Sequence, residues 1–309
     1  MLYTAHARNP ERGRRRHNRR LLTEISMPDK TPSAAGRIET ALEERFGTRI
    51  AIDPALPGLD ALARMSEHRS HRRYTQDPVA PDLLRVLMAC ALSAPSKSDL
   101  QQADIVHVAD RAKVQAIAGW IPDMPWIADA PVFLIFCGNH RRIHQIAEWR
   151  GIPFVNDHLD HFMNAAVDAG IVMTTFIHAA EAVGLGACPI SAVRNKPREV
   201  SALLGLPERV FPVAGLTLGY PREEGRITPR LPLEVTVHTD HFDESRVREH
   251  VEAYDRRRAH LLPYRNVRGV KQYGKPEVYG WSDDKARQYS RPERADFGAF
   301  IREKGFNLE

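Results

Sequence analysis

The longest apolar pattern with helical spacing runs from Asp157 to Val183. Its apolar residues and alanines leave little room for a polar face, and a helix that is apolar nearly all round is normally buried. At 1.5 Å per residue this helix would be about 40 Å long. Gly184 follows it as a natural helix C-cap. We expect the helix to cross the core of the domain or to lie in a subunit interface.

Shorter patterns predict further elements on both sides of this helix. Two continuous apolar runs, Pro131–Cys137 and Val210–Tyr220, are typical of strands buried on both faces in the middle of a sheet. Apolar residues at helical spacing predict a helix over 81–92, with Pro81 in its first turn. The other expected elements are a surface helix over 37–46, a strand over 103–108, a short helix over 112–119, a partly exposed strand over 233–238 and an amphipathic helix over 291–306.

The composition is that of a soluble globular protein, because 27% of the 309 residues are charged and 43% are hydrophobic. No run approaches the roughly 18 uninterrupted apolar residues of a membrane span, so we expect no membrane segment. We expect one folded core over 37–253, preceded by a basic, disordered extension and linker over 1–36. The basic, Gly- and Tyr-rich part over 254–309 has weak periodicity, so we expect it to pack on the core or on a partner subunit.

The positive charge is concentrated before Met27. Seven arginines and two glutamates precede this residue, a balance of +5, which equals the formal net charge of the whole chain. One interpretation is a basic arm that binds nucleic acid. The other, which we favour, is an upstream extension of the reading frame with Met27 as the natural start. Nothing later in the chain resembles a nucleic-acid-binding motif, so a nucleic-acid partner is not expected.

The cysteines and histidines do not predict a metal site. Cys90, Cys137 and Cys188 are far apart in apolar sequence, which predicts reduced, buried thiols in a cytoplasmic protein. His158 and His161 are three positions apart and could share a helix face, whereas His238 and His241 have the same spacing but lie at the end of an expected strand. The second helix with Glu and Glu-x-x-His that di-iron bundles use is missing. We therefore expect no metal.

The stretch from Ser66 to Gln101 contains the most suggestive chemistry. A basic cluster, HRSHRR from His68, stands before the helix expected over 81–92, and that helix ends in the small polar loop Ala94–Ser98. An anion needs cations together with N–H and hydroxyl donors, and this stretch offers all three. Taken alone, a solvated basic turn explains the cluster equally well.

The nucleotide-binding and nucleophile motifs that would define other enzyme classes are absent or broken. GLGACP from Gly184 begins like the dinucleotide fingerprint, but Pro189 stands where the third glycine belongs and a helix precedes it instead of a strand. There is no GxxxxGK[ST] loop and no GxSxG elbow. A Rossmann dehydrogenase and a serine hydrolase are therefore not expected.

Five motifs, in order and at characteristic separations, resemble the FMN-dependent nitroreductase family. They are HRSHRRYTQDPV from His68, APSKSDLQ from Ala94, AAEAVGLGACPISAVRN from Ala179, LTLGYP from Leu216 and PRLPLEVTVH from Pro229. Within the family they are similar to the NADPH-dependent oxygen-insensitive nitroreductases and flavin reductase P. The resemblance extends well over about residues 68–242 and more weakly beyond.

This resemblance implies an α+β fold, a nitroreductase-like sandwich with a mixed, antiparallel-rich sheet flanked by helices, in an intertwined homodimer whose interface contains the long helix. It implies that one set of residues holds FMN: His68, Arg69, Ser70 and Arg72 at the phosphate, ribityl chain and pyrimidine edge; Ser96, Ser98 and Gln101 from the other subunit or loop; Pro189, Ile190 and Ser191 along the ring; and Arg230 at the phosphate. A phosphate requires arginines, and a cation stabilises the negative charge that reduced flavin gathers.

The implied activity is ping-pong hydride transfer from NADPH or NADH, through FMN, to a nitroaromatic, a quinone or free flavin. No catalytic side chain is expected, because the flavin carries the chemistry. Arg265 and Arg268 are candidates for the 2′-phosphate of NADPH. The chain departs from the branch at Pro189-Ile190-Ser191-Ala192, where Tyr-Ile-Gly-Gly is usual, and at Thr228, where lysine is usual. These departures leave open a flavin-binding protein with little turnover.

Overall fold

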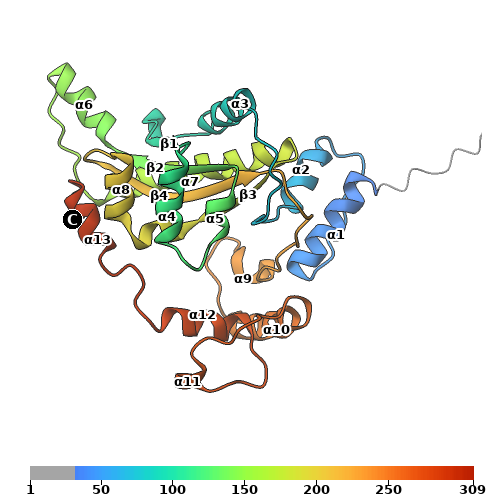
Figure 1. Ribbon diagram of the computed structural model, residues 1–309. Coiled ribbons are helices and arrows are strands. Elements are labelled where there is room, and N and C mark those ends of the chain that lie inside the picture. The colour runs from blue at the N-terminus through green and yellow to red at the C-terminus, as the bar shows by residue number, and fades with distance from the viewer. Residues whose placement is uncertain (1–31) are drawn as a thin grey trace, which may run out of the picture. The chain divides into compact units, whose positions relative to one another are not determined.

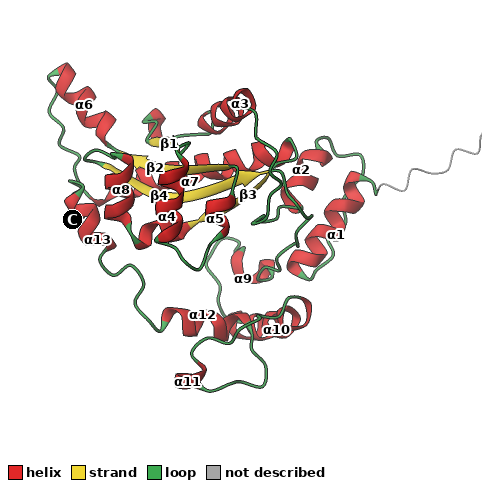
Figure 2. Ribbon diagram, viewed as in Figure 1, coloured by secondary structure: helices red, strands yellow, loops and turns green. Residues whose placement is uncertain are grey.

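The sheet of the protein has four antiparallel strands in the part of the chain that the structure, a computed structural model, describes, residues 32–309. The strands are β1 (Ala103–His107), β2 (Val132–Asn139), β3 (Gly186–Ile190) and β4 (Val210–Gly219), and their order across the sheet is β1-β2-β4-β3 (Figure 2). The expectations for the arm before Met27 lie outside the described residues.

The two central strands are buried on both faces, as their continuous apolar sequence predicts. Every residue of β2 is buried. On one face Leu134 and Phe136 pack with α3 (Pro81–Leu92) and α7 (Leu159–Ala182). On the other face Phe133, Ile135 and Cys137 pack with α4 (Arg111–Gly119), α5 (Trp126–Asp129) and α8 (Pro197–Leu204). Figure 1 shows α4, α5 and α8 on one side of the sheet and α7 on the other.

The long central helix is confirmed, and it begins two residues later than expected. Its C-terminal turn closes as a glycine cap, because Gly184 has φ +79° and Leu185 N–H donates to Ala180 O at 3.0 Å. By length and composition α7 could cross a membrane, a test that the core helix of a soluble protein also passes. Phe176 of α7 meets Phe136 of the sheet edge to face, with ring centroids 5.8 Å apart, so α7 packs as a core helix.

The remaining elements lie before, between and after these layers. They are α1 (Ala34–Phe46), α2 (Leu59–Ser66), the 3₁₀ turns η1 (Lys97–Asp99) and η2 (Ser191–Asn195), α6 (Arg141–Arg150), α9 (Leu233–Thr236), α10 (Val247–Leu261), α11 (Val270–Tyr273), α12 (Trp281–Tyr289) and α13 (Phe297–Glu303). In the C-terminal part, α10 packs with α12, while Phe300 and Ile301 of α13 join Phe211 of β4 in a core cluster.

Three expectations from the sequence are wrong. The segment 233–238 is not a strand: its first four residues form α9, and Ser70 already occupies the outer edge of β3 that another strand could have used. The last helix begins at Phe297 instead of Arg291, because Pro292 and the positive φ of Arg294 interrupt helical geometry before it. Cys90 is exposed on α3, whereas Cys137 and Cys188 are buried.

Candidate functional site

The basic segment, His68–Arg73, is pinned along the outer edge of β3. Ser70 forms a parallel bridge with Ala187, and His71 N–H donates to Ala187 O at 3.0 Å. Beyond it, Arg222 N–H donates to Arg73 O at 3.0 Å. An extended segment sends successive side chains to opposite sides, so this pairing decides which basic groups face the same space.

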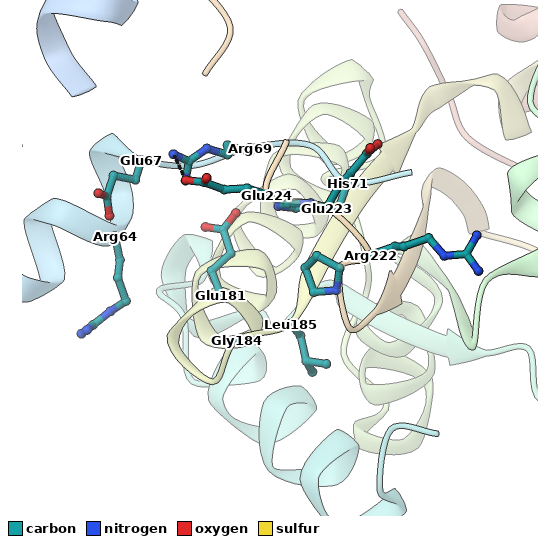
Figure 3. A pocket seen from close by; sticks show the side chains of 11 residues that line it. Arg64, Glu67, Arg69, His71, Glu181, Gly184, Leu185, Arg222, Glu223 and Glu224 are labelled. Carbon is teal, nitrogen blue, oxygen red and sulfur yellow. Dashed lines mark hydrogen bonds and ion pairs between the residues drawn. The ribbon is translucent and has the colours of Figure 1, made fainter. Parts of the chain in front are cut away.

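The two sides of the basic segment carry different groups. Arg69 and His71 line a cavity of about 440 Å³ together with Glu181, and Figure 3 shows Arg69 and His71 on the basic segment and Glu181 on a separate helix, α7. The guanidinium of Arg72 instead lies 5.7 Å from the ring centroid of Trp126. It also lies beside Cys188: burial raises the pKa of this thiol, and the charge of Arg72 opposes that rise.

The cavity contains a donor and an acceptor that have no partner. Arg69 binds Glu224 through Nη2 at 3.0 Å, yet its Nε is buried without a hydrogen bond. Glu181 approaches His68 Nδ1 at 2.5 Å through one carboxylate oxygen, while its other oxygen is buried without a hydrogen bond and lies 3.9 Å from His178 Nδ1. Buried unpaired groups of this kind cost roughly 1–3 kcal/mol each. Because the cavity is lined by four glutamates as well as three arginines, a ligand that offers an acceptor to Arg69 Nε and a hydroxyl to Glu181 would satisfy both groups.

His71 fills the space between two glycines. A Cβ at Gly186 would come within 2.7 Å of the His71 ring, and one at Gly225 within 3.3 Å. Burial lowers the pKa of His71, and the nearby carboxylate of Glu181 opposes that shift. The imidazole therefore favours its neutral form at the floor of this cavity.

Arg45, at the end of α1, ties two parts of the site together. Its buried guanidinium donates to Ser66 O at 3.0 Å, to His68 O at 2.8 Å and to Thr228 O at 3.2 Å. Burial lowers the pKa of Arg45, and the charges of Arg230 and Arg69 lower it further. Arg45 therefore lies close enough to both Arg230 and Arg69 to be repelled by each of them, which favours a bound anion.

Arg230 is held in place through its main chain. Its N–H donates to Arg45 O at 2.7 Å, and Tyr254 Oη donates to the preceding carbonyl, Pro229 O, at 3.0 Å. Among residues 32–309, the Arg230 guanidinium reaches only carbonyl oxygens, Thr228 O at 3.4 Å and Pro229 O at 3.5 Å. These contacts are long, so the positive charge of Arg230 is free to meet a ligand.

The Ser96 loop is fixed by α7. Asp168, which is 2% exposed, accepts hydrogen bonds from Ser96 Oγ at 3.0 Å and from Lys97 N–H at 3.1 Å. Ser96 Oγ also accepts from Gln101 N–H at 2.7 Å. Ser98 and Gln101 both have φ +50°, a strained backbone that persists only where surrounding bonds hold it.

One chain does not bring the Ser96 loop and the basic segment together. Asp168, which holds the loop, and Glu181, which contacts His68, both lie on α7. They are 13 positions apart in that helix, about 20 Å at 1.5 Å per residue.

The expected ring-facing residues end strand β3. Pro189 and Ser191 are exposed and Ile190 is buried between them. A proline is tolerated here because β3 is an edge strand. Ser191 Oγ accepts from Arg294 at 3.3 Å, and Arg294 Nε donates to Asn195 at 2.7 Å. The segment before α13 therefore reaches the end of β3.

The two candidates for the 2′-phosphate of NADPH lie after α10. Arg265 is exposed. Arg268 Nε forms an ion pair with the buried carboxylate of Asp284 at 3.0 Å, and its N–H donates to Tyr279 Oη at 3.1 Å. Arg268 thus already holds the loop between α10 and α12.

Sequence reasoning missed Arg45, Asp168 and Arg294. Arg45 contacts a carbonyl 183 positions away, and Asp168 was hidden within the apolar pattern of α7. None of the three residues belongs to a recognisable motif. For Asp168, an aspartate inside an otherwise apolar helical pattern was the one available hint.

Within residues 32–309, no group of three or more His, Cys, Asp or Glu side chains is arranged to hold a metal ion.

Comparisons with known proteins agree with this geometry. The chain matches the nitroreductase family model over residues 65–220 and the nitroreductase family C-terminal domain over residues 228–309. An FMN reductase (NAD(P)H) of Bacillus subtilis is 34% identical over 81% of this chain and 99% of its own length. Among solved structures, B. megaterium NfrA2 superposes with a TM-score of 0.73 at 33% identity, covering 81% of this chain and 99% of that one. The NADPH:FMN oxidoreductase from Vibrio harveyi complexed with NAD+ gives 0.69 at 27% identity, covering 80% and 98%. With the sheet, the basic segment and both family models in agreement, the chain belongs to the nitroreductase family.

Proposed function

We propose that this protein is an FMN-dependent oxidoreductase that takes hydride from NAD(P)H and reduces a small-molecule acceptor, such as free flavin, a nitroaromatic or a quinone. Its relatives are named FMN reductase, NADPH-flavin oxidoreductase and oxygen-insensitive NADPH nitroreductase. The buried free thiols, Cys137 and Cys188, fit a reducing cytoplasm. The observation that carries the proposal is the convergence of three arginines around the basic segment.

The arginine cluster fits the phosphate of FMN. Arg45 is repelled by both Arg230 and Arg69, and Arg69 Nε is buried without a hydrogen-bond partner among the described residues. A phosphate dianion satisfies the Nε donor and offsets the repulsion. Thr228, which stands where the branch usually has lysine, contributes its carbonyl to Arg45 instead of a charge.

The remaining residues position the flavin and tune it. Bound FMN supplies the hydride acceptor and donor that no side chain of the protein provides. Arg72, on the other side of the basic segment from Arg69, brings a cation to the pyrimidine edge, where it favours the form that carries negative charge. Pro189, Ile190 and Ser191 form the wall along the ring. His68 and Ser70 complete the polar contacts, and Arg265 and Arg268 stay candidates for the 2′-phosphate of NADPH.

The separation along α7 supports a homodimer with shared sites. Leu159, Met163 and Val167 recur every four residues and are 48%, 60% and 47% exposed, so α7 presents an apolar stripe. We propose that a second copy covers this stripe and inserts its own Ser96, Ser98 and Gln101 beside the basic segment. In that arrangement one flavin contacts the basic segment of one chain and the Ser96 loop of the other, although Asp168 and Glu181, which hold these two groups, are about 20 Å apart within one chain.

Replacing Val167 by arginine is expected to yield a monomer that retains little FMN, because a charge in the apolar stripe opposes its burial. Light scattering coupled to size exclusion gives the mass, and absorbance gives bound FMN. Gln115→Arg, on the exposed side of α4 across the sheet, is the matched control and should remain dimeric with full FMN. A wild-type monomer, or a Val167→Arg dimer with normal flavin content, contradicts the shared site.

The purified protein is expected to be yellow, or to become yellow on adding FMN, and to bleach when NADPH is added without oxygen. Its spectrum should return on adding a quinone or a nitroaromatic. A protein that takes up FMN but does not bleach is the flavin binder without turnover. A colourless protein that neither takes up FMN nor oxidises NADPH contradicts the whole proposal. Mixing FMN and NADPH without the protein is the control.

A further inference from the structure

A second cavity lies where α1 and the segment 228–236 meet α10 and α12; it shares Arg45 and Arg230 with the proposed phosphate site, but Arg258 and the aromatic residues that line it have no assigned role. It has a volume of about 600 Å³, within the range of small-molecule sites. We call it the α10 cavity. Its charged lining is Arg45, Arg230, Arg258 and Lys285, and no carboxylate lines it. The cavity is therefore electropositive.

The buried Arg258 indicates a missing anion. This residue is 9% exposed, lines the cavity, and has both Nε and Nη1 buried without a hydrogen-bond partner. A guanidinium has no acceptor role and needs partners for its five donors. Lys285 differs, because its ammonium already binds Asp284 at 2.7 Å and Gln288 at 3.0 Å. Arg258 is thus the group whose hydrogen bonds a ligand would complete.

The walls of the α10 cavity indicate that the anion carries an aromatic ring. Tyr254, Tyr264 and Trp281 line it, and the Arg258 guanidinium lies 4.5 Å from the Tyr264 centroid. The rings of Tyr254 and Trp281 meet edge to face at 5.9 Å. Aromatic walls offer stacking surface to a planar heterocycle, and a buried guanidinium binds phosphate through paired hydrogen bonds. A phosphorylated purine nucleoside combines both features.

The α10 cavity adjoins the proposed flavin site. Arg45 lines the cavity and also holds the carbonyls of Ser66 and His68. We propose that the α10 cavity binds the phosphorylated adenosine end of NAD(P)H, with Arg258 as the phosphate ligand and Tyr264 and Trp281 as the stacking surface. This inference rests on the proposed function, since the adenosine belongs to the hydride donor. It places the main phosphate contact on α10, before Arg265 and the ion-paired Arg268.

The direct test is calorimetric binding of adenosine 2′,5′-bisphosphate and of 5′-AMP to the FMN-loaded protein, without turnover. Arg258→Met keeps the apolar cover over Tyr264 and is expected to weaken binding about 10- to 100-fold, because a charge-assisted phosphate contact is lost. Arg258→Lys should recover part of that loss. Arg256→Met, an exposed position on the same helix, is the matched control and should bind normally. Arg265→Met should change binding less than Arg258→Met.

Steady-state kinetics then identify which phosphate Arg258 contacts. A rise in KM for NADPH alone assigns the 2′-phosphate, and a rise for both NADPH and NADH assigns the 5′-phosphate; either outcome supports the site. Unchanged binding and unchanged KM in Arg258→Met overturn it, as does a loss of FMN without a change in nucleotide binding. Tyr264→Leu, which removes the ring packed against Arg258 but keeps the charge, tests the same site if Arg258→Met does not fold. Failure of the wild type to oxidise NADPH contradicts the proposed function instead, because calorimetry does not depend on turnover.

Discussion

Replacing Arg45 by methionine is expected to abolish stable retention of FMN and to lower the free energy of unfolding by roughly 2–3 kcal/mol. The guanidinium of Arg45 satisfies carbonyls of both Ser66 and His68 and a third at Thr228. Methionine fills the same space but leaves these carbonyls without donors. The basic segment then loses its fixed position relative to Arg230. Arg69 and Arg230 are no longer held close enough to bind the same phosphate.

The Arg45 prediction is checked by urea unfolding followed by far-UV circular dichroism, and by the ratio of flavin to protein absorbance after gel filtration. Arg49→Met is the matched control: Arg49 follows α1 and pairs with Glu39 at the surface, at 3.0 Å. Its loss should change the unfolding free energy by less than about 0.5 kcal/mol. Normal FMN content in Arg45→Met would falsify the bridging role.

The protein is expected to lose stability steeply as the pH falls from about 6.5 towards 5, because of a buried histidine cluster. His140 is 0% exposed and neither ring nitrogen has a hydrogen-bond partner. Its ring lies 4.3 Å from that of His161 and 5.0 Å from that of His144. Burial, and to a smaller extent the neighbours His161, His144 and Arg209, lower the pKa of His140 to about 3 against the opposing charge of Asp157.

The direction of the pH dependence of stability follows from which state, folded or unfolded, binds the proton. The folded protein keeps His140 neutral, whereas the unfolded chain protonates this residue near pH 6.5. Stability is therefore complete above that pH and is lost as the pH falls towards 3. His140 alone accounts for about 2 kcal/mol between pH 7 and pH 5. Burial also lowers the pKa values of His144 and His161, which adds loss in the same direction.

Unfolding free energies measured between pH 7.5 and pH 5 check this prediction. His140→Phe retains an aromatic ring and removes the proton, so its stability should vary less over that range. His260→Gln, at an exposed position of α10, should keep the slope of the wild type. The Arg209–Asp157 ion pair titrates in a separate window, because Arg209 lowers the pKa of Asp157 and that contribution is lost only below pH 3.8. An unchanged slope in His140→Phe contradicts the assignment.

Strong apolar patterns predicted the elements that form the core. The helix over 81–92 begins and ends at the expected residues, and both buried strands lie at the centre of the sheet. The expected strand over 233–238 failed because a six-residue alternation does not decide between a strand and a short turn of helix. That choice depends on whether a sheet edge is open, which no local pattern reveals.

The basic segment could be located from sequence, but its division into two sides could not. Which of Arg69 and Arg72 faces which space depends on the bridge between Ser70 and Ala187, a pairing across 117 positions of sequence. The bridging role of Arg45 depends on three carbonyls that carry no sequence signature, since every residue has one. Long-range main-chain contacts of this kind are fixed only when the whole fold is known.

The spacing of Asp168 and Glu181 along α7 has a genetic consequence in the proposed dimer. Each flavin site takes its basic segment from one chain and its Ser96 loop from the other. Within one chain, a defect in the basic segment and a defect in the Ser96 loop therefore damage different sites of the dimer. A mixed dimer of one chain damaged at the basic segment and one damaged at the loop contains one doubly damaged site and one intact site. Two inactive alleles of this kind should therefore complement each other, up to half of the normal number of sites per mixed dimer.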